Sequence, residues 1–271
     1  MSFYLKAFED LVVEFENQCL WITLNRPEAS NAYSIGMVQA LVEVLKYADL
    51  DNDVRVMVIT GAGKNFCAGG DVKAMKGKTG MFAGESNQLR EAYQAGIQQI
   101  PLTISNLKTP LIAMVNGAAV GAGCDLAAMC DLRIVSGEAT FAETFAKVGL
   151  VPGDGGAFFI TRLIGYGKAM EMFLTCKIFS AAEALNMGLV NQVVLPIELK
   201  NKTEVIVEQL RALPPIALQM TKKAISHAYQ NDLSSHLELM AAYQSITQRS
   251  SDHFKALDGM IEKSKPDFTH S

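Results

Sequence analysis

The chain has 271 residues, of which 49% are hydrophobic and 19% are charged, and its formal net charge at pH 7 is -4. This composition is typical of a globular protein with a substantial core, and it excludes the disordered, collagen-like and disulfide-scaffold classes. Because 24 basic residues face 28 acidic ones and no block is rich in Lys or Arg, we expect no nucleic-acid partner.

The cysteines and the N-terminal segment indicate a cytoplasmic protein. The five cysteines are scattered and show no spacing typical of zinc ligands, so we expect reduced thiols and no metal site. Residues 1–18 carry acidic side chains and lack the apolar core and cleavage site of a signal peptide. The most apolar stretch, residues 110–130, contains Asn116 and Asp125, which are costly in lipid. We therefore expect no membrane association.

The first predicted elements are strands. Residues 11–24 contain two β-rich runs around a turn at 16–18, which predicts a hairpin. From Ser34 to Leu50, apolar residues recur at helical spacing, and Ser34 is suited to cap a helix. Residues 55–63 form a short β-branched run that ends in glycines, typical of a buried strand that leads into a loop.

A similar succession follows. The pattern predicts a long helix over 86–107, a second buried strand over 109–117 and a helix after Gly123. Short strands are expected over 131–143 and helices over 144–175. From about residue 180 the pattern is nearly all helical. The chain therefore divides into an α/β part, residues 1–197, and an α-helical C-terminal region, residues 198–271, which we expect to pack against a neighbouring subunit.

Two glycine-rich loops each follow a predicted buried strand: TGAGKNFCAGGD at 60–71 and NGAAVGAGCD at 116–125. Backbone N–H groups at the start of a helix can hold an anion, but neither loop has the glycine spacing of a nucleotide-binding motif. If each loop aims one N–H group at the same carbonyl oxygen, the two form an oxyanion hole that stabilises an enolate. The alternative is that the glycines only permit tight turns and close packing.

Three segments resemble, in order and spacing, the signature segments of the crotonase (enoyl-CoA hydratase/isomerase) family. They are FCAGGDVKAM (66–75), VNGAAVGAGCDLAAMCD (115–131) and FAETFAKVGLVPGDGG (141–156). The blocks at 24–34 and 181–194 are also similar to that family. The resemblance implies an α/β fold, a crotonase-like spiral of ββα units that carries the CoA-binding and catalytic residues. An α-helical C-terminal region would form trimers, and these would commonly pair into hexamers.

The resemblance also implies an acyl-CoA substrate, with coenzyme A as part of the substrate and no separate cofactor. The N–H groups of Gly70 and Ala122 would hold the thioester carbonyl. The positions matching the family's contacts to coenzyme A are Arg26, Ala29, Ala68, Gly70, Asp71, Val72 and Lys73.

The catalytic acids depart from the family pattern. Two glutamates activate water in the family's hydratases, and Asp125 stands at the first of these positions. The second is occupied by Phe145, which cannot transfer a proton. Glu143 and Asp154 are the candidates to replace it, and Glu143 can reach the same space only if its segment is a loop. The alternatives are that Asp125 caps its helix and that the other two acids are solvated or cap turns.

Three functions follow from these residues. The first is a hydro-lyase that adds water to a 2-enoyl-CoA by means of an acid pair drawn from the three carboxyls. The second is an isomerase that converts a 3-enoyl-CoA to a 2-enoyl-CoA, which needs one carboxylate. The third is an acyl-CoA-binding protein without activity. All four histidines lie beyond residue 226, so a Ser-His-Asp hydrolase is not indicated.

Overall fold

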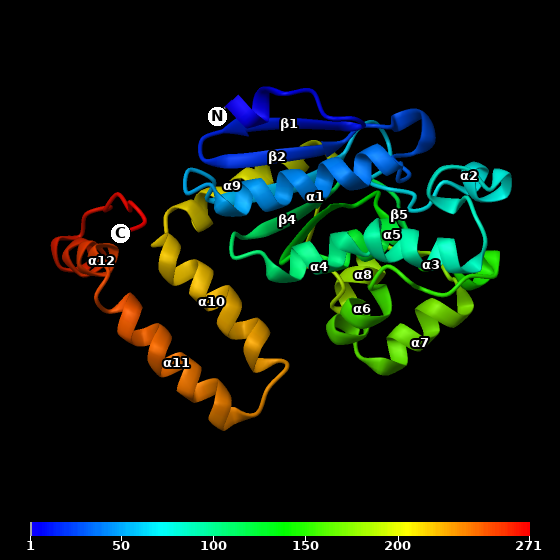
Figure 1. The fold of residues 1–271 in the computed structure, drawn as a ribbon. Coiled ribbons are helices and arrows are strands. Elements are labelled where there is room, and N and C mark those ends of the chain that lie inside the picture. The colour runs from blue at the N-terminus through cyan, green and yellow to red at the C-terminus, as the bar shows by residue number, and fades with distance from the viewer. Residues whose placement is uncertain (1) are drawn as a thin grey trace.

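The computed structural model describes residues 2–271 and contains a six-stranded sheet with helices on both faces (Figure 1). The strand order is β1-β2-β3-β4-β6-β9; β1 is antiparallel to β2, and the other pairs are parallel. These strands are β1 (Leu11–Glu16), β2 (Cys19–Leu24), β3 (Val56–Gly61), β4 (Leu111–Val115), β6 (Leu132–Ser136) and β9 (Gln192–Val194). A smaller sheet contains β5 (Ala119–Val120), β7 (Thr140–Ala142) and β8 (Phe179–Ser180).

Helices connect the strands and form the C-terminal part of the chain. The α-helices before residue 198 are α1 (Ile35–Leu50), α2 (Val72–Gly77), α3 (Ser86–Ala95), α4 (Gln99–Asn106), α5 (Ala122–Met129), α6 (Gly156–Ile164), α7 (Tyr166–Thr175) and α8 (Ala181–Met187). Those after it are α9 (Leu199–Arg211), α10 (Pro215–Ala228), α11 (Leu233–Thr247) and α12 (Ser251–Glu262). Short 3-10 helices are η1 (Ser2–Leu5), η2 (Pro27–Ala29), η3 (Gly80–Phe82), η4 (Ala146–Val148) and η5 (Pro196–Glu198).

The first predicted unit is confirmed. β1 and β2 form the expected hairpin, and its turn places Asn17 and Gln18 in the left-handed region. The Ser34 side chain caps α1 by accepting a hydrogen bond from the Met37 N–H at 3.0 Å. β3 follows and pairs in parallel with β2, which completes the β-β-α-β order.

Three predicted elements need correction. The helix expected over 86–107 is broken between α3 and α4, because Gly96 leaves the helical conformation. The helices expected over 144–175 begin only at residue 156, apart from η4, since glycines and a proline occupy residues 149–155. Strand β9 lies in the stretch that was expected to be helical, and it pairs with β6 at the edge of the sheet.

The sheet is buried on both faces. In β3, Met57 and Ile59 belong to the larger core cluster, while Val56 and Val58 belong to the smaller one. Because side chains alternate along a strand, these two sets lie on opposite faces. The larger cluster includes residues of α1, α4 and α5, and the smaller one includes Val207 of α9. Helix α9 therefore covers the face of the sheet opposite to α1.

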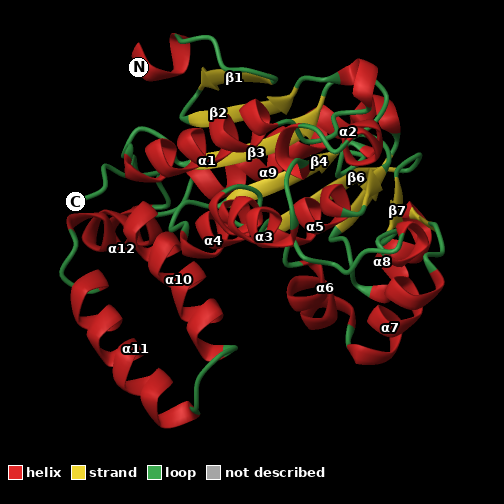
Figure 2. Ribbon diagram, turned by 45° about the vertical axis from the view of Figure 1, so that its right-hand side comes forward, coloured by secondary structure: helices red, strands yellow, loops and turns green. Residues whose placement is uncertain are grey.

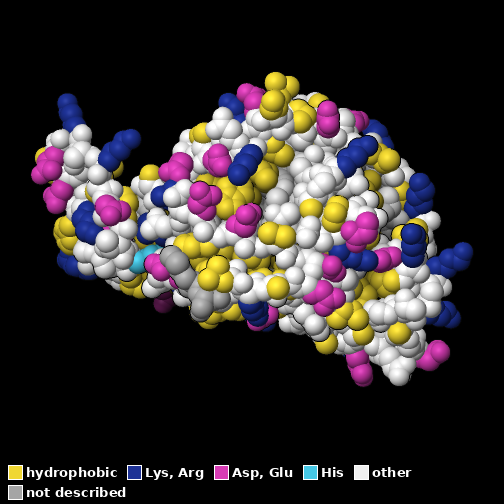
Figure 3. Space-filling view, turned by 90° about the horizontal axis from the view of Figure 1, so that it is seen from above, with side chains coloured by type: hydrophobic (Ala, Val, Ile, Leu, Met, Phe, Trp, Pro, Cys, Tyr) yellow, Lys and Arg dark blue, Asp and Glu magenta, His cyan; other side chains and the backbone are white. Residues whose placement is uncertain are grey.

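Helices α10 to α12 form an arm that projects from the rounded body (Figure 2) and is seen as a lobe at the left of the space-filling view (Figure 3); α10 is tied to the body by the ion pair between Lys222 and Asp131 at 2.7 Å. No residue of α11 is buried, and its exposed side chains include the apolar Leu233, Leu237 and Ile246. A groove of about 870 Å³ separates this helical arm from α5 and α6. None of the helices within residues 2–271 is both long enough and apolar enough to cross a membrane.

Candidate active site

The two glycine-rich loops lie against each other because they follow neighbouring parallel strands, β3 and β4. Their backbones are hydrogen-bonded directly. The Cys67 N–H donates to the Ala118 carbonyl at 3.1 Å, and the Val120 N–H donates to the Cys67 carbonyl at 2.9 Å. The loops therefore form one rigid backbone unit at the ends of these strands.

Three glycines are required by this close approach. A Cβ atom on Gly117 would lie 1.9 Å from the Lys64 carbonyl oxygen. On Gly123 it would lie 2.1 Å from the Cys67 carbonyl oxygen. On Gly69, whose φ is +80°, it would lie 2.8 Å from the Ala122 nitrogen. For these positions the packing interpretation of the glycines holds.

Gly70 is different, because a Cβ atom there would meet only the flexible end of the Met75 side chain. The N–H groups of Gly70 and Ala122 donate to no residue within 2–271. Ala122 is the first residue of α5, where backbone donors have no partner inside the helix. The closeness of Gly69 to Ala122 places the two free donors on neighbouring backbone segments. Such a pair can bind one oxygen that gains negative charge.

The structure brings the three candidate acids together beside these donors. Asp125 lies on α5, Glu143 follows β7, and Asp154 lies in the turn before α6. Asp125 and Glu143 have no exposed surface, and Asp154 is 3% exposed. The Asp125 carboxyl lies against Gly156, where a Cβ atom would be 1.6 Å from Oδ1. All three are thus buried around one point rather than solvated.

The Asp125 side chain makes no capping hydrogen bond at the N-terminus of α5, although it lies in the first turn, where the helix dipole favours an acid. Within residues 2–271, no hydrogen bond of good geometry reaches the carboxyl oxygens of Asp125 or Glu143, although the Gly156 N–H lies close to Asp125 and the Cys124 thiol lies close to Glu143. Burial, and then the Asp154 charge, raise the pKa of Asp125 to about 8. Burial, and then the Asp125 charge, raise the pKa of Glu143 well above its usual value. Two such neighbours cannot both be ionised, and a protonated Glu143 can donate its O–H to Asp125.

Asp154 has a different environment. The Tyr93 hydroxyl of α3 donates a hydrogen bond to its Oδ1 at 2.7 Å. Burial raises the pKa of Asp154, and this hydrogen bond opposes the rise. Within residues 2–271, Asp154 is therefore the carboxyl of the three that accepts a side-chain hydrogen bond of good geometry. No sequence pattern pointed to Tyr93, which lies 61 residues away from Asp154.

Phe145 packs beside the second glycine-rich loop. Its ring lies 3.8 Å from the position that a Cβ atom of Gly121 would take. Residues 143–145 are not part of a regular α-helix, because β7 ends at Ala142 and η4 begins at Ala146. The segment is thus a loop, which is the condition for Glu143 to reach the space of the second acid.

The residues predicted to bind coenzyme A lie on two segments that are held together. The Ala68 N–H donates to the Ser30 carbonyl at 2.9 Å. Arg26 pairs with Asp71 at 3.3 Å, and Asp71 caps α2 through the Lys73 N–H. The side chains beside them, Val72 and Lys73, are exposed, whereas Ala29 and Ala68 are half-buried. Two of these candidates, Arg26 and Asp71, therefore already bind each other.

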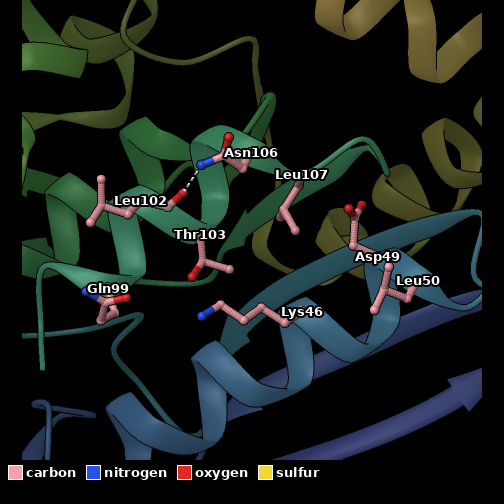
Figure 4. A pocket seen from close by; sticks show the side chains of 8 residues that line it. All are labelled: Lys46, Asp49, Leu50, Gln99, Leu102, Thr103, Asn106 and Leu107. Carbon is pink, nitrogen blue, oxygen red and sulfur yellow. Dashed lines mark hydrogen bonds between the residues drawn. The ribbon is translucent and has the colours of Figure 1, made fainter. Parts of the chain in front are cut away.

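A second cavity, of about 460 Å³, lies elsewhere, between α1 and α4 (Figure 4). Lys46 and Asp49 line it from α1, and Gln99 and Thr103 line it from α4. It shares no lining residue with the predicted site.

Several known proteins are similar to this chain in sequence and in fold. Residues 14–271 match the family model described as enoyl-CoA hydratase/isomerase. A probable enoyl-CoA hydratase of Mycobacterium leprae is 34% identical, over 97% of this chain and 99% of that protein. The short-chain-enoyl-CoA hydratase of Clostridium acetobutylicum is 34% identical, over 94% and 96% of the two chains. The crystal structure of an enoyl-CoA hydratase from Bacillus anthracis is similar with a TM-score of 0.91 at 31% identity, over 97% of this chain and 100% of that chain.

Proposed function

Because the chain belongs to the enoyl-CoA hydratase/isomerase family and has its crotonase fold, we propose that it adds water to a 2-enoyl-CoA. It is an enzyme of the hydro-lyase type, and its product is a 3-hydroxyacyl-CoA. The observation that carries this assignment in the structure is the pair of free backbone donors beside three buried carboxyls.

The backbone donors of Gly70 and Ala122 stabilise the charge that develops during the reaction. When the water oxygen bonds to C3, the electron pair of the double bond moves through C2 to the thioester oxygen. The resulting enolate oxygen lies between the two N–H groups. Removal of one such donor from an enzyme raises the reaction barrier by about 3 kcal/mol.

Asp154 and Asp125 supply the proton transfers. Asp154 accepts a hydrogen bond that favours its ionised form, so it takes the proton from water. Asp125 holds a proton near neutral pH because of its burial, so it gives that proton to C2. Glu143 lies beside Asp125 with no exposed surface; it stays protonated and orients Asp125. Phe145 is apolar and takes no part in proton transfer.

The remaining assignments concern coenzyme A, assembly and location. The nucleotide end of the substrate contacts the two paired segments that carry Arg26, Ala29, Ala68, Asp71, Val72 and Lys73, of which Val72 and Lys73 are exposed. The exposed apolar side chains of α11, Leu233, Leu237 and Ile246, support association into a trimer or a pair of trimers. We place the enzyme in the cytoplasm and assign it no cofactor besides the coenzyme A of its substrate.

Incubation of the purified protein with crotonyl-CoA and, separately, with a 3-enoyl-CoA in D2O tests the reaction. We expect 3-hydroxybutyryl-CoA from crotonyl-CoA, with deuterium at C2. If the protein converts the 3-enoyl-CoA but does not hydrate crotonyl-CoA, its function is isomerisation and not hydration. Binding of both thioesters without turnover would exclude the enzyme assignment.

A further inference from the structure

Tyr93 lies on helix α3, in a surface segment next to the acid cluster. Residues 71–96, which include α2, η3 and α3, contain no buried residue. They lie at the end of the molecule opposite to the helical arm (Figure 1). Most of this segment faces solvent, yet the Tyr93 ring is half-buried and packs against the main core. Tyr93 is therefore directed inward from a helix that is otherwise exposed.

Two side chains fix the turn that carries Asp154. The Tyr93 hydroxyl donates to the carboxylate itself, and its ring lies 3.0 Å from the position that a Cβ atom of Gly153 would take. The Gln98 side-chain amide donates to the Gly153 carbonyl at 3.0 Å. Both residues hold the turn in place, but only Tyr93 contacts the carboxylate. Substitutions of Tyr93 and of Gln98 can therefore distinguish an effect on the charge of Asp154 from an effect on the position of its backbone.

In the hydrogen bond between Tyr93 and Asp154, the hydroxyl is always the donor and the carboxylate always the acceptor. Burial and the neighbouring Asp154 charge raise the pKa of Tyr93, so its hydroxyl stays protonated and can only donate to the carboxylate. A donor on Oδ1 favours the ionised form of Asp154. It also leaves Oδ2 as the oxygen that can accept a proton from water.

We propose that Tyr93 is a positioning residue for the hydration reaction, which directs Oδ2 of Asp154 toward the reacting water and keeps this carboxylate ionised. The proposal rests on the hydratase function described above. According to the proposal, α3 affects catalysis through Tyr93, although α3 contains none of the candidate catalytic residues. It also predicts that the activity depends on the docking of residues 71–96 through one hydroxyl group.

Tyr93→Phe tests the proposal because it removes the hydroxyl and keeps the ring that packs on Gly153. We expect kcat for crotonyl-CoA hydration to fall by about ten- to hundredfold, as for a lost hydrogen bond to a charged group. We expect KM to change by less than about threefold. The acid limb of the kcat profile should move to higher pH, since Asp154 loses the donor that favours its ionised form.

Gln98→Leu is the matched control, because it loosens the same turn without removing the donor to the carboxylate. It should leave the acid limb in place. Chemical shifts of ¹³C-labelled aspartate, titrated in the free protein, give a readout that does not depend on turnover; the Asp154 titration should move upward in Tyr93→Phe only. Unchanged profiles and titration in Tyr93→Phe, with the wild type hydrating crotonyl-CoA, would overturn the proposal and leave the hydratase function standing. An inactive wild type would reject the function itself, while the titration would still report on the contact.

Discussion

Replacement of Glu143 by Gln distinguishes two ways in which this carboxyl can serve the reaction. Glu143 is fully buried, accepts no hydrogen bond of good geometry within residues 2–271, and has a pKa raised by burial and by the Asp125 charge. If it stays protonated, its O–H donates to Asp125, and the amide N–H of a Gln side chain can do the same. We therefore expect Glu143→Gln to retain kcat within about threefold, a change below about 1 kcal/mol.

Glu143→Leu is the matched variant, since it is apolar and offers no donor. Asp125 would then be a buried polar group without a partner, which costs about 1–3 kcal/mol. Carried into the transition state, that range corresponds to a kcat about 5- to 150-fold lower. The assay is the loss of enoyl-thioester absorbance with crotonyl-CoA, with Tm measured for each variant. If Glu143→Gln keeps its Tm but loses about 10²- to 10⁴-fold in kcat, as when a proton-transferring group is removed, Glu143 itself transfers the proton and our reasoning is refuted.

Asp154→Asn removes the proposed base, so hydration should slow by about 10²- to 10⁴-fold while calorimetry still detects crotonyl-CoA binding; an active Asn variant would exclude this role. Burial raises the pKa of Asp125 in the folded state to about 8, so its contribution to stability is complete below the unfolded pKa of about 3.9 and is lost as the pH rises through about 8. Asp125→Asn should therefore raise Tm, relative to the wild type, more at pH 9 than at pH 5, and equal changes at both values would contradict the assignment. Gly123→Ala places a Cβ atom 2.1 Å from the Cys67 carbonyl oxygen, which should cost about 1–3 kcal/mol of folding free energy; thermal denaturation would reveal the loss, and an unchanged Tm would mean that the two loops can separate freely.

Strands β1 to β4 and helix α1 could be predicted from the sequence because their signals are local. Ser34 and the apolar spacing after it are sufficient to define α1, and β3 is a continuous apolar run. β9 could not be predicted, since it has three residues and exists only through its pairing with β6, more than 50 residues earlier. The break at Gly96 was also missed, because an isolated glycine is compatible with a helix until its neighbours fix the backbone.

The site could be predicted in part. The form of the two loops and the family resemblance named Gly70 and Ala122, which lie on adjacent backbone segments with free N–H groups. The same reasoning named the three acids and placed Asp125 at the first catalytic position, but it could not choose between Glu143 and Asp154 for the second. Their ranking depends on which carboxyl has a donor, and the donor to Asp154 comes from α3. Such a contact between distant segments leaves no trace in residue spacing.

The direct backbone pairing of the two glycine-rich loops has a consequence for how this enzyme can change. The distance between the N–H groups of Gly70 and Ala122, which we propose to bind the enolate, is set by main-chain hydrogen bonds and by glycines that admit no side chain. Ordinary substitutions therefore cannot adjust it gradually. Residues 71–96, in contrast, contain no buried residue and can accept many substitutions without loss of the core. The two backbone donors thus belong to a part of the chain that tolerates little change, whereas residues 71–96 can vary around Tyr93 and the proposed CoA-binding positions 71–73.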